Sequence, residues 1–208
     1  FKDKRIKYFS SKNYFKLYDA RNRAVQKAKG KFICFLDTDD WWYKNKLKLQ
    51  VKEFQKNKNY NVIYTNLNIF YEKNKKIKIF SKEKLPSGTI TQEMLDKYRI
   101  GVITVMIKRE IFKKYKFDKN YEIIGDFDFF MKISLSNKFG YIDKPLAFYR
   151  IHGKNFSDIK LNIYHKELQH WINKIGPNFI KEGFLLRGQI LFLRKLKFKN
   201  FLAKIKNL

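Results

Sequence analysis

The stretch FICFLDTDDWW, residues 32–42, is the most informative segment of this sequence. Its first half is a run of apolar residues with β-forming tendency, and its second half places three carboxylates within four positions. A nearly continuous apolar run predicts a central strand, over residues 31–36, that is covered on both faces. Ligands of open α/β sheets collect beyond the carboxyl ends of such strands. We therefore expect the acidic turn to belong to a ligand site.

Asp37, Asp39 and Asp40 form this acidic turn. Carboxylates this close repel one another, so a positive charge is expected beside them. Hard oxygen ligands without an adjacent His or Cys favour Mg²⁺ or Mn²⁺, ions that share their coordination with phosphate oxygens. The alternative is that Asp39 or Asp40 caps the next helix. Because one aspartate would suffice for a cap, the pattern favours a metal site.

Helical periodicity surrounds this turn. A helix over residues 18–29 is expected to end at Gly30 as its C-terminal cap, and Leu47, Val51 and Phe54 mark a second helix. Thr89 and Gln92 resemble a capping box before a short helix. Further helical patterns cover residues 126–137 and the chain from residue 158 onward.

The remaining apolar segments have strand character. Residues 62–65 and 102–107 predict short strands, and residues 67–71 with 77–80 predict a hairpin. Residues 141–150 predict an extended segment in which Pro145 marks an edge or a bulge. The alternation of strands and helices indicates an α/β sheet followed by a helical tail.

Composition restricts the class of protein further. Against 19 acidic residues there are 47 lysines and arginines, giving a formal charge of +28, but they are scattered along the whole chain. The charge therefore predicts attraction to polyanions such as diphosphates and acidic lipids, without a specific binding face. The single Cys34 fits a reducing compartment, and no apolar run reaches the ~20 residues of a membrane span. We expect a cytoplasmic protein, with contact to the inner face of the membrane.

Three motifs carry a family resemblance. The segment ARNRAVQKAKGKFICFLDTDD, residues 20–40, resembles the "ARN…G…A.G.YI.FLD.DD" pattern of glycosyltransferase family 2. Residues 124–134, IGDFDFFMKIS, are similar to the family's "ED.DLWLRL", and residues 148–157, FYRIHGKNFS, to its "YR.H..N.S". The resemblance implies a Rossmann-like nucleotide-diphospho-sugar transferase (GT-A) sheet. It also implies transfer of a sugar from a nucleotide-diphosphate donor to a hydroxyl of a glycan or lipid-linked acceptor, with inversion, in cell-surface polysaccharide or glycan synthesis.

The family's opening strands, which read like "SVIIPTYN" and "VDDGS", have no counterpart in this sequence. We therefore expect an N-terminally truncated sheet, either a fragment of a longer enzyme or a chain that is inactive alone. Residues 1–157 are expected to form the partial catalytic domain and residues 158–208 a basic amphipathic tail.

The resemblance assigns donor-side roles to five residues. Asp39 and Asp40 would hold Mn²⁺ or Mg²⁺, which would stabilise the departing diphosphate. Asp37 would contact the ribose or neighbour the metal, and Arg21 would contact the nucleotide or its phosphates. His152 would reach the metal or the diphosphate. The alternatives are a surface arginine and an ordinary polar histidine.

Asp126 is the candidate general base that deprotonates the acceptor hydroxyl. Asp128 points away from it if the segment is helical, so one of the two can serve. The family's Glu, which often helps to bind the acceptor, is replaced here by Gly125. The alternative for Asp126 is stabilisation of a helix N-terminus.

The tail allows a second interpretation, in which the chain is a basic adaptor that binds a membrane or nucleic acid through this segment. Residues 180–208 intersperse leucine, isoleucine and phenylalanine with lysine and arginine, a pattern typical of an interfacial helix on a membrane. Packing against the catalytic domain explains the same pattern. No recognisable nucleic-acid motif is present, so we expect no nucleic-acid partner.

Overall fold

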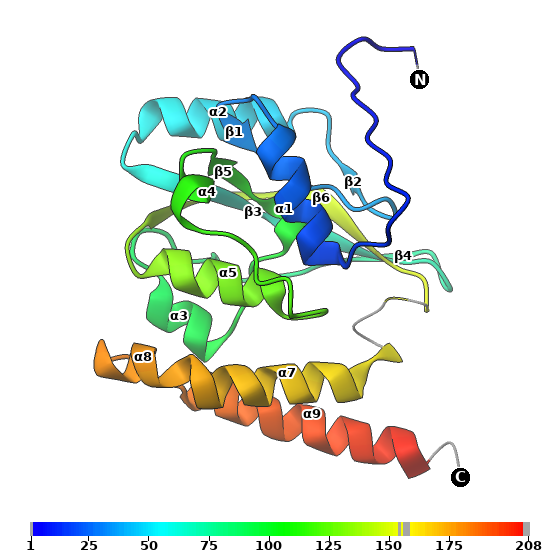
Figure 1. Cartoon of the computed structure of the whole chain (residues 1–208), viewed down its shortest axis with the longest axis vertical. Helices are drawn as coiled ribbons and strands as arrows, with labels where there is room; N and C mark the ends of the chain where they lie inside the picture. The colour runs from blue at the N-terminus through cyan, green and yellow to red at the C-terminus, as the bar shows by residue number, and fades with distance from the viewer. Residues whose placement is uncertain (1, 154, 156–158, 206–208) are drawn as a thin grey trace.

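The computed structural model, which describes residues 2–153, 155 and 159–205, is a layered mixed α/β structure (Figure 1). Its strands are β1 (Phe32–Ile33), β2 (Trp41–Trp42), β3 (Tyr60–Tyr71), β4 (Lys76–Ile79), β5 (Met106–Lys108) and β6 (Lys138–Ile151). Its helices are α1 (Leu17–Lys27), α2 (Lys46–Lys56), α3 (Thr91–Asp96), the 3₁₀ helix η1 (Val102–Thr104), α4 (Ile111–Lys114), α5 (Gly125–Ser134), α7 (Leu161–Lys174), α8 (Gly176–Lys181) and α9 (Arg187–Ile205).

The long strands β3 and β6 run parallel to each other at the centre of the sheet. The strand order is β1-β5-β3-β6-β2, and β4 adds to β3 as a hairpin. Two strands expected from the sequence, 62–65 and 67–71, are one continuous strand, β3. The register of β6 on β3 shifts where Pro145 lies opposite Asn66, which is the irregularity expected at that proline.

The predicted central strand over residues 31–36 was wrong in both length and place. Only Phe32 and Ile33 form β1, which pairs with β5 alone among the described strands and so lies at the end of the strand order. After Ile33 the chain leaves the ladder and bends toward the acidic turn, with Phe35 buried and Leu36 47% exposed. The apolar run reports burial of alternate side chains and not backbone pairing over its whole length.

Alternation along the strands divides the core between the two faces of the sheet. Val62 and Tyr64 of β3 face the main core, whereas Ile63 faces a smaller cluster with Phe54 of α2 and Met106 of β5. This period of two is what a strand buried on both sides requires. Cys34 packs against the smaller cluster as a partly buried free cysteine.

Three local predictions also need correction. Helix α1 ends at Lys27 with Ala28 as its C-cap, so Gly30 does not cap it. Helix α3 has Ile90 as its N-cap with no side-chain cap, so Thr89 and Gln92 form no capping box. Residues 102–104 coil into η1 before β5 begins, because the Thr104 hydroxyl and backbone N–H both bond the Gly101 carbonyl.

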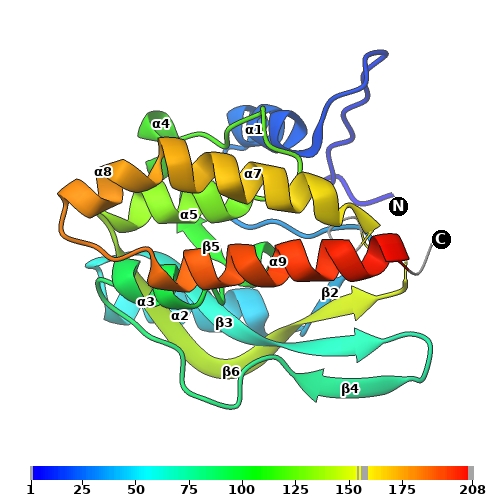
Figure 2. The same cartoon turned by 90° about the horizontal axis from the view of Figure 1, so that it is seen from below.

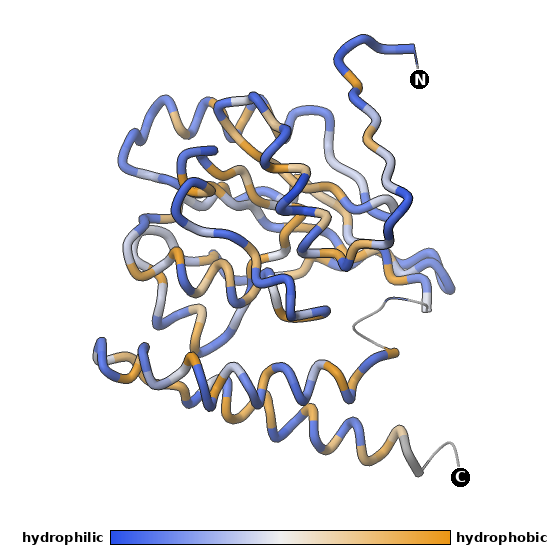
Figure 3. The backbone as a smooth tube through the Cα atoms, viewed as in Figure 1, coloured by the Kyte–Doolittle hydropathy of each residue, from blue (hydrophilic) through white to orange (hydrophobic). Residues whose placement is uncertain are grey.

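The C-terminal helices form a further layer beneath α3 and α5. Figure 2 shows α7 and α9 side by side across this face, and Figure 3 shows apolar positions recurring along both. Leu168, Trp171, Phe179 and Leu196 belong to the same buried core as Phe127 of α5. Packing against the rest of the chain thus accounts for one side of the predicted tail. Its boundary, residues 157 and 158, lies outside the described residues and stays a prediction.

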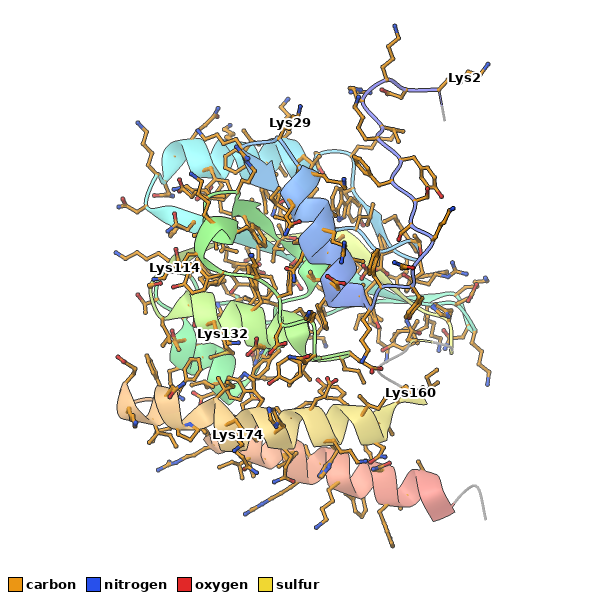
Figure 4. The ribbon with its side chains drawn as sticks, viewed as in Figure 1. Lys2, Lys29, Lys114, Lys132, Lys160 and Lys174 are labelled. Atoms are coloured by element: carbon orange, nitrogen blue, oxygen red, sulfur yellow. The ribbon has the colours of Figure 1, made fainter. Side chains whose placement is uncertain are left out.

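Helix α9 keeps several apolar side chains exposed. Leu191 is 55% exposed, Phe198 62% and Phe201 59%. Among the helices that the structure describes, none has the length and apolar character needed to cross a bilayer. The labelled lysines in Figure 4 are spread over the molecule, from Lys2 near the N-terminus to Lys160 and Lys174 at the two ends of α7, consistent with the scattered charge expected from composition.

Candidate active site

One cavity of about 620 Å³ collects all six residues that the sequence singled out. It lies between α1, the acidic turn, the N-terminal end of α5 and the loop after β6. Its walls include the predicted residues Arg21, Asp37, Asp39, Asp40, Asp126 and His152. Segments more than a hundred positions apart in the chain therefore meet here.

Strand pairing explains how the acidic turn reaches His152. β2 runs antiparallel to β6, with Trp41 opposite Phe148, so the residues just before β2 lie beside the end of β6. Asp40 accepts the backbone N–H of Arg150 at 2.9 Å, and Asp39 Oδ2 lies 3.0 Å from His152 Nε2. The two tryptophans thus serve as the strand that positions the aspartates.

The carboxylates of the turn differ in environment. Asp40 is 9% exposed, and burial raises the pKa of its carboxyl to about 7, against the opposing effect of the Arg150 N–H. Asp37 and Asp39 are half-buried and face the cavity. Neither Asp39 nor Asp40 caps α2, whose N-cap is Asn45 without a side-chain bond. The capping alternative is therefore wrong for this turn.

Arg21 supplies the positive charge expected beside the acidic turn. Its guanidinium donates to both oxygens of Asp37, at 2.8 and 3.1 Å. The residue is 7% exposed and packs over the rings of Tyr18 and Phe35, so the alternative of a surface arginine is wrong. Tyr18 and Arg21 share one face of α1 because they are three positions apart.

Asp126 and Asp128 point to different places, as expected for neighbours two positions apart on a helix. Asp126 faces the cavity, and burial raises the pKa of its carboxyl, with Arg21 acting in the opposite direction. Asp128 is fully buried outside the cavity, bonded to Lys132 at 2.7 Å and to the indole of Trp171 at 3.1 Å. Of the two, Asp126 is the one that can reach a substrate in this cavity.

Asp126 also bonds locally at the start of α5. Its Oδ1 accepts the N–H of Phe127 at 2.8 Å, and the Tyr18 hydroxyl lies 3.4 Å from the same oxygen. The N-cap of α5 is Ile124, with no side-chain cap. Stabilisation of the helix N-terminus and exposure to the cavity therefore coexist at this residue.

Glu167 was missed by the sequence analysis. From α7 it accepts the backbone N–H groups of Glu122, Ile123 and Ile124, at 2.6, 3.0 and 3.1 Å. These three residues lead directly into α5, so Glu167 orients the segment that carries Asp126. No local pattern could reveal this, because the partners are more than forty positions apart.

Tyr98 was missed as well. Its ring packs edge-on against Phe127, and its hydroxyl is buried without a hydrogen-bond partner within the part of the chain that the structure describes. Buried hydroxyls are nearly always bonded, so an orphaned one at a cavity wall points to a ligand or water in that place.

The presence of Gly125 in place of the glutamate expected from the family motif has a steric explanation. A Cβ added at Gly125 would meet the Tyr18 ring at 2.5 Å. That ring is held in place because the Tyr18 hydroxyl donates to the Ile123 carbonyl at 2.6 Å. Tyr18 therefore occupies the space that a side chain at position 125 would need.

The donor set fits a hard divalent cation that is completed by substrate oxygens. Within the described residues, no three His, Cys, Asp or Glu side chains form a cage that could hold a metal ion alone. Asp39 and His152 offer one oxygen and one nitrogen at the cavity, with Asp40 and Asp37 adjacent. Mg²⁺ and Mn²⁺ commonly take a few protein ligands and fill the rest of their shell with phosphate and water.

A family model described as glycosyl transferase family 2 matches residues 1–116, more than half of the chain. The chain belongs to glycosyltransferase family 2. An uncharacterised glycosyltransferase of Rickettsia conorii is 33% identical to this family 2 chain, over 96% of the chain and 33% of that protein. The chain spans 24–34% of the length of three such rickettsial relatives.

One further relative and one solved structure are informative. The Escherichia coli enzyme named UDP-Glc:α-D-GlcNAc-diphosphoundecaprenol β-1,3-glucosyltransferase is 34% identical over 56% of this chain and 44% of that protein. S. aureus TarS (1–349), solved in complex with UDP-GlcNAc, superposes with a TM-score of 0.54 at 18% identity, over 74% of this chain and 46% of TarS. The superposition confirms the predicted nucleotide-diphospho-sugar transferase (GT-A) fold.

Proposed function

We propose that the protein transfers a sugar from a nucleotide-diphosphate donor to an acceptor hydroxyl in this cavity. The transfer inverts the anomeric carbon and serves the synthesis of a polysaccharide or other glycan. The observation that carries the proposal is the arrangement of charge around one cavity. Arg21 bonded to Asp37 and His152 beside Asp39 form a first group of charges on its wall, and the carboxylate of Asp126, which lines the same cavity, is a second. A donor diphosphate suits the first group and an acceptor hydroxyl suits the second.

The transfer needs one base and one stabilised leaving group. Asp126 takes the proton of the acceptor hydroxyl, and the freed oxygen bonds the anomeric carbon. The bond from that carbon to the diphosphate oxygen breaks on the opposite side, and its electron pair leaves with the diphosphate, so the configuration inverts. The guanidinium of Arg21, which is bonded to Asp37 and lines the cavity, would contact the nucleotide phosphates.

Asp39 and His152, with Asp40 beside them, would hold Mn²⁺ or Mg²⁺ at the diphosphate. Such an ion acts as a Lewis acid that neutralises charge on the leaving group. Asp37, turned toward Arg21, remains available for a ribose hydroxyl.

Relatives support this class of reaction. The named E. coli relative uses UDP-Glc, and TarS was solved with UDP-GlcNAc, so uridine-diphosphate sugars are the first donors to test. The strong positive charge of the chain supports a place at the cytoplasmic face of an anionic membrane.

The test is a screen of nucleotide sugars with the chain in the presence and absence of Mn²⁺, measuring release of the nucleoside diphosphate. We expect metal-dependent hydrolysis of one donor, lost in Asp39→Asn and kept in the control Asp143→Asn, an exposed carboxylate of β6 outside the cavity. Full metal-dependent activity of Asp39→Asn would refute the assignment.

A further inference from the structure

A second cavity, of about 690 Å³, adjoins the active-site cavity and lies between α3, α5, α7 and α9. The two cavities share four lining residues: Tyr98, Ile123, Asp126 and Tyr164. The candidate base therefore borders both spaces. If a donor occupied the first cavity, an acceptor could still reach Asp126 from the second cavity.

The walls of the second cavity are mainly apolar. Phe127 of α5, Leu168 of α7 and Leu191 and Phe192 of α9 line it. The ring of Phe192 packs edge-on against Tyr164, which stands at the junction of the two cavities. A bare sugar is a poor occupant for such walls, because hydroxyls that lose water without gaining partners are costly to bury.

The outer end of this cavity is amphipathic. Leu191 is 55% exposed and Phe192 37% exposed, and the basic Lys195 lines the cavity one turn further along α9. An apolar chain leaving the cavity would thus continue over apolar side chains with a cation beside them. At the junction of the two cavities, Tyr98 contributes a polar group, a buried hydroxyl with no hydrogen-bond partner among the described residues.

The helices around the cavity are firmly placed. The side-chain amide of Gln189 donates to the carbonyls of Met94 and Leu95 at the end of α3, at 3.3 and 3.0 Å. A Cβ at Gly188 would meet the Asp96 carbonyl oxygen at 2.1 Å, so α9 starts in close contact with α3. The cavity is therefore a built feature of the packing between these helices.

We propose that the second cavity is the acceptor site and that its acceptor is a sugar carried on a lipid chain. The sugar hydroxyl would lie between Asp126 and the Tyr98 hydroxyl, and the chain would pass along Leu168, Leu191 and Phe192 to the surface of α9. This inference rests on the proposed function, since it takes Asp126 as the base, and it goes further by selecting a lipid-linked acceptor over a free glycan.

The test is calorimetric titration of the chain with decyl β-glucoside, below its micelle concentration, and with glucose. We expect the glucoside to bind at least tenfold more tightly than glucose. Leu191→Glu should weaken glucoside binding at least tenfold by placing a charge against the chain, and Tyr98→Phe should weaken it about three- to tenfold by removing one hydrogen bond. The matched control is Phe198→Glu, which alters an exposed apolar residue of α9 outside the cavity. This variant should bind the glucoside with unchanged affinity.

Three results would overturn the inference. They are equal affinities for the glucoside and glucose, an unchanged affinity in both Leu191→Glu and Tyr98→Phe, and an equal loss in Leu191→Glu and Phe198→Glu. The last would put the chain on the outer surface of α9. Donor hydrolysis by the unaltered chain reports on the proposed function and glucoside binding on the second cavity, so either can fail while the other holds.

Discussion

His152 Nε2 lies 3.0 Å from Asp39 Oδ2, although the two residues are 113 positions apart. Antiparallel pairing of β2 with β6 produces this contact, since it places the acidic turn beside the loop that follows β6. One oxygen and one nitrogen thus face the same cavity at the point where we propose a divalent cation.

We predict that Asp39 and His152 are the side chains on which Mn²⁺ binding by this chain depends. Asp39→Asn and His152→Ala should each weaken Mn²⁺ binding at least tenfold in the presence of UDP, because each removes one ligand from a shell with few protein donors. Electron paramagnetic resonance of free Mn²⁺ measures this directly. Asp143→Asn should bind Mn²⁺ as the unaltered chain does, and wild-type affinity in both site variants would exclude the pair as ligands.

Asp126 and Asp128 form a matched pair for testing the base. Asp126→Asn should lower turnover by about 10² to 10⁴ with little change in UDP binding, because the proton acceptor is lost. Asp128→Asn removes a carboxylate that lies outside the active-site cavity, so its main effect should be on stability. Steady-state rates and UDP titrations of both variants distinguish the roles, and equal losses of turnover would contradict them.

Burial also predicts a pH dependence for turnover. It raises the pKa of Asp126 above the usual range of an aspartate, and a base must be deprotonated to act. The rate should therefore increase as pH rises through this elevated pKa. Asp126→Asn should lack that ascending limb in a pH–rate profile, and an identical limb in the variant would assign it to another group.

The Asp128–Trp171 bond is predicted to couple α5 to α7. Trp171→Phe leaves a fully buried carboxylate oxygen without its indole donor, which should cost about 1–3 kcal/mol in the free energy of unfolding. In a double-mutant cycle with Asp128→Ala, which removes the acceptor, urea unfolding should reveal a coupling of about 0.5–3 kcal/mol. Simple additivity would show that the bond contributes nothing to stability.

Gly125 should tolerate no side chain while Tyr18 is present. Gly125→Ala places a Cβ 2.5 Å from the Tyr18 ring, and such overpacking typically costs about 1–3 kcal/mol. The double variant Gly125→Ala/Tyr18→Ala removes the clash, so its loss of stability should be smaller than the sum of the single losses. Thermal unfolding measures all three variants, and additive losses would mean that another contact limits position 125.

The burial of Lys46 leads us to predict that the stability of the protein depends on pH. The residue is fully buried, its ammonium bonds Gln50 at 2.8 Å and lies over the Trp42 ring, and burial lowers its pKa to about 8. Below pH 8 the charge is retained in the folded state at a cost, which Lys46→Met should relieve, giving a gain of about 1–3 kcal/mol at pH 7.

The sign of the pH effect follows from this depressed pKa. As pH rises from about 8 toward the unfolded value near 10.4, the folded state has lost the proton that the unfolded state still binds, so the wild type gains stability. The advantage of Lys46→Met should therefore shrink toward pH 10 in urea unfolding curves. An advantage independent of pH would show that Lys46 does not titrate in this range.

Much of this protein was determined by its sequence alone, where the information is local. Helical periodicity located α2 and α5, strand alternation located the β3–β4 hairpin, and three motifs indicated the family. The same motifs named six candidate site residues, whose roles stay predictions. The helix and strand predictions succeed because a helical or strand period records which side chains face the core, whatever packs against them.

Which candidate residues share a cavity, and which side chains surround them, depends on tertiary packing. The strand that we expected at the centre of the sheet lies at the end of the strand order. The prediction failed because an apolar run indicates burial and does not indicate which strands pair with it. The contacts of Glu167, the placement of Asp128 against Trp171 and the orphaned Tyr98 hydroxyl all arise from helices that pack across long sequence separations. Such contacts depend on the meeting of distant surfaces, for which a single sequence carries no local signal.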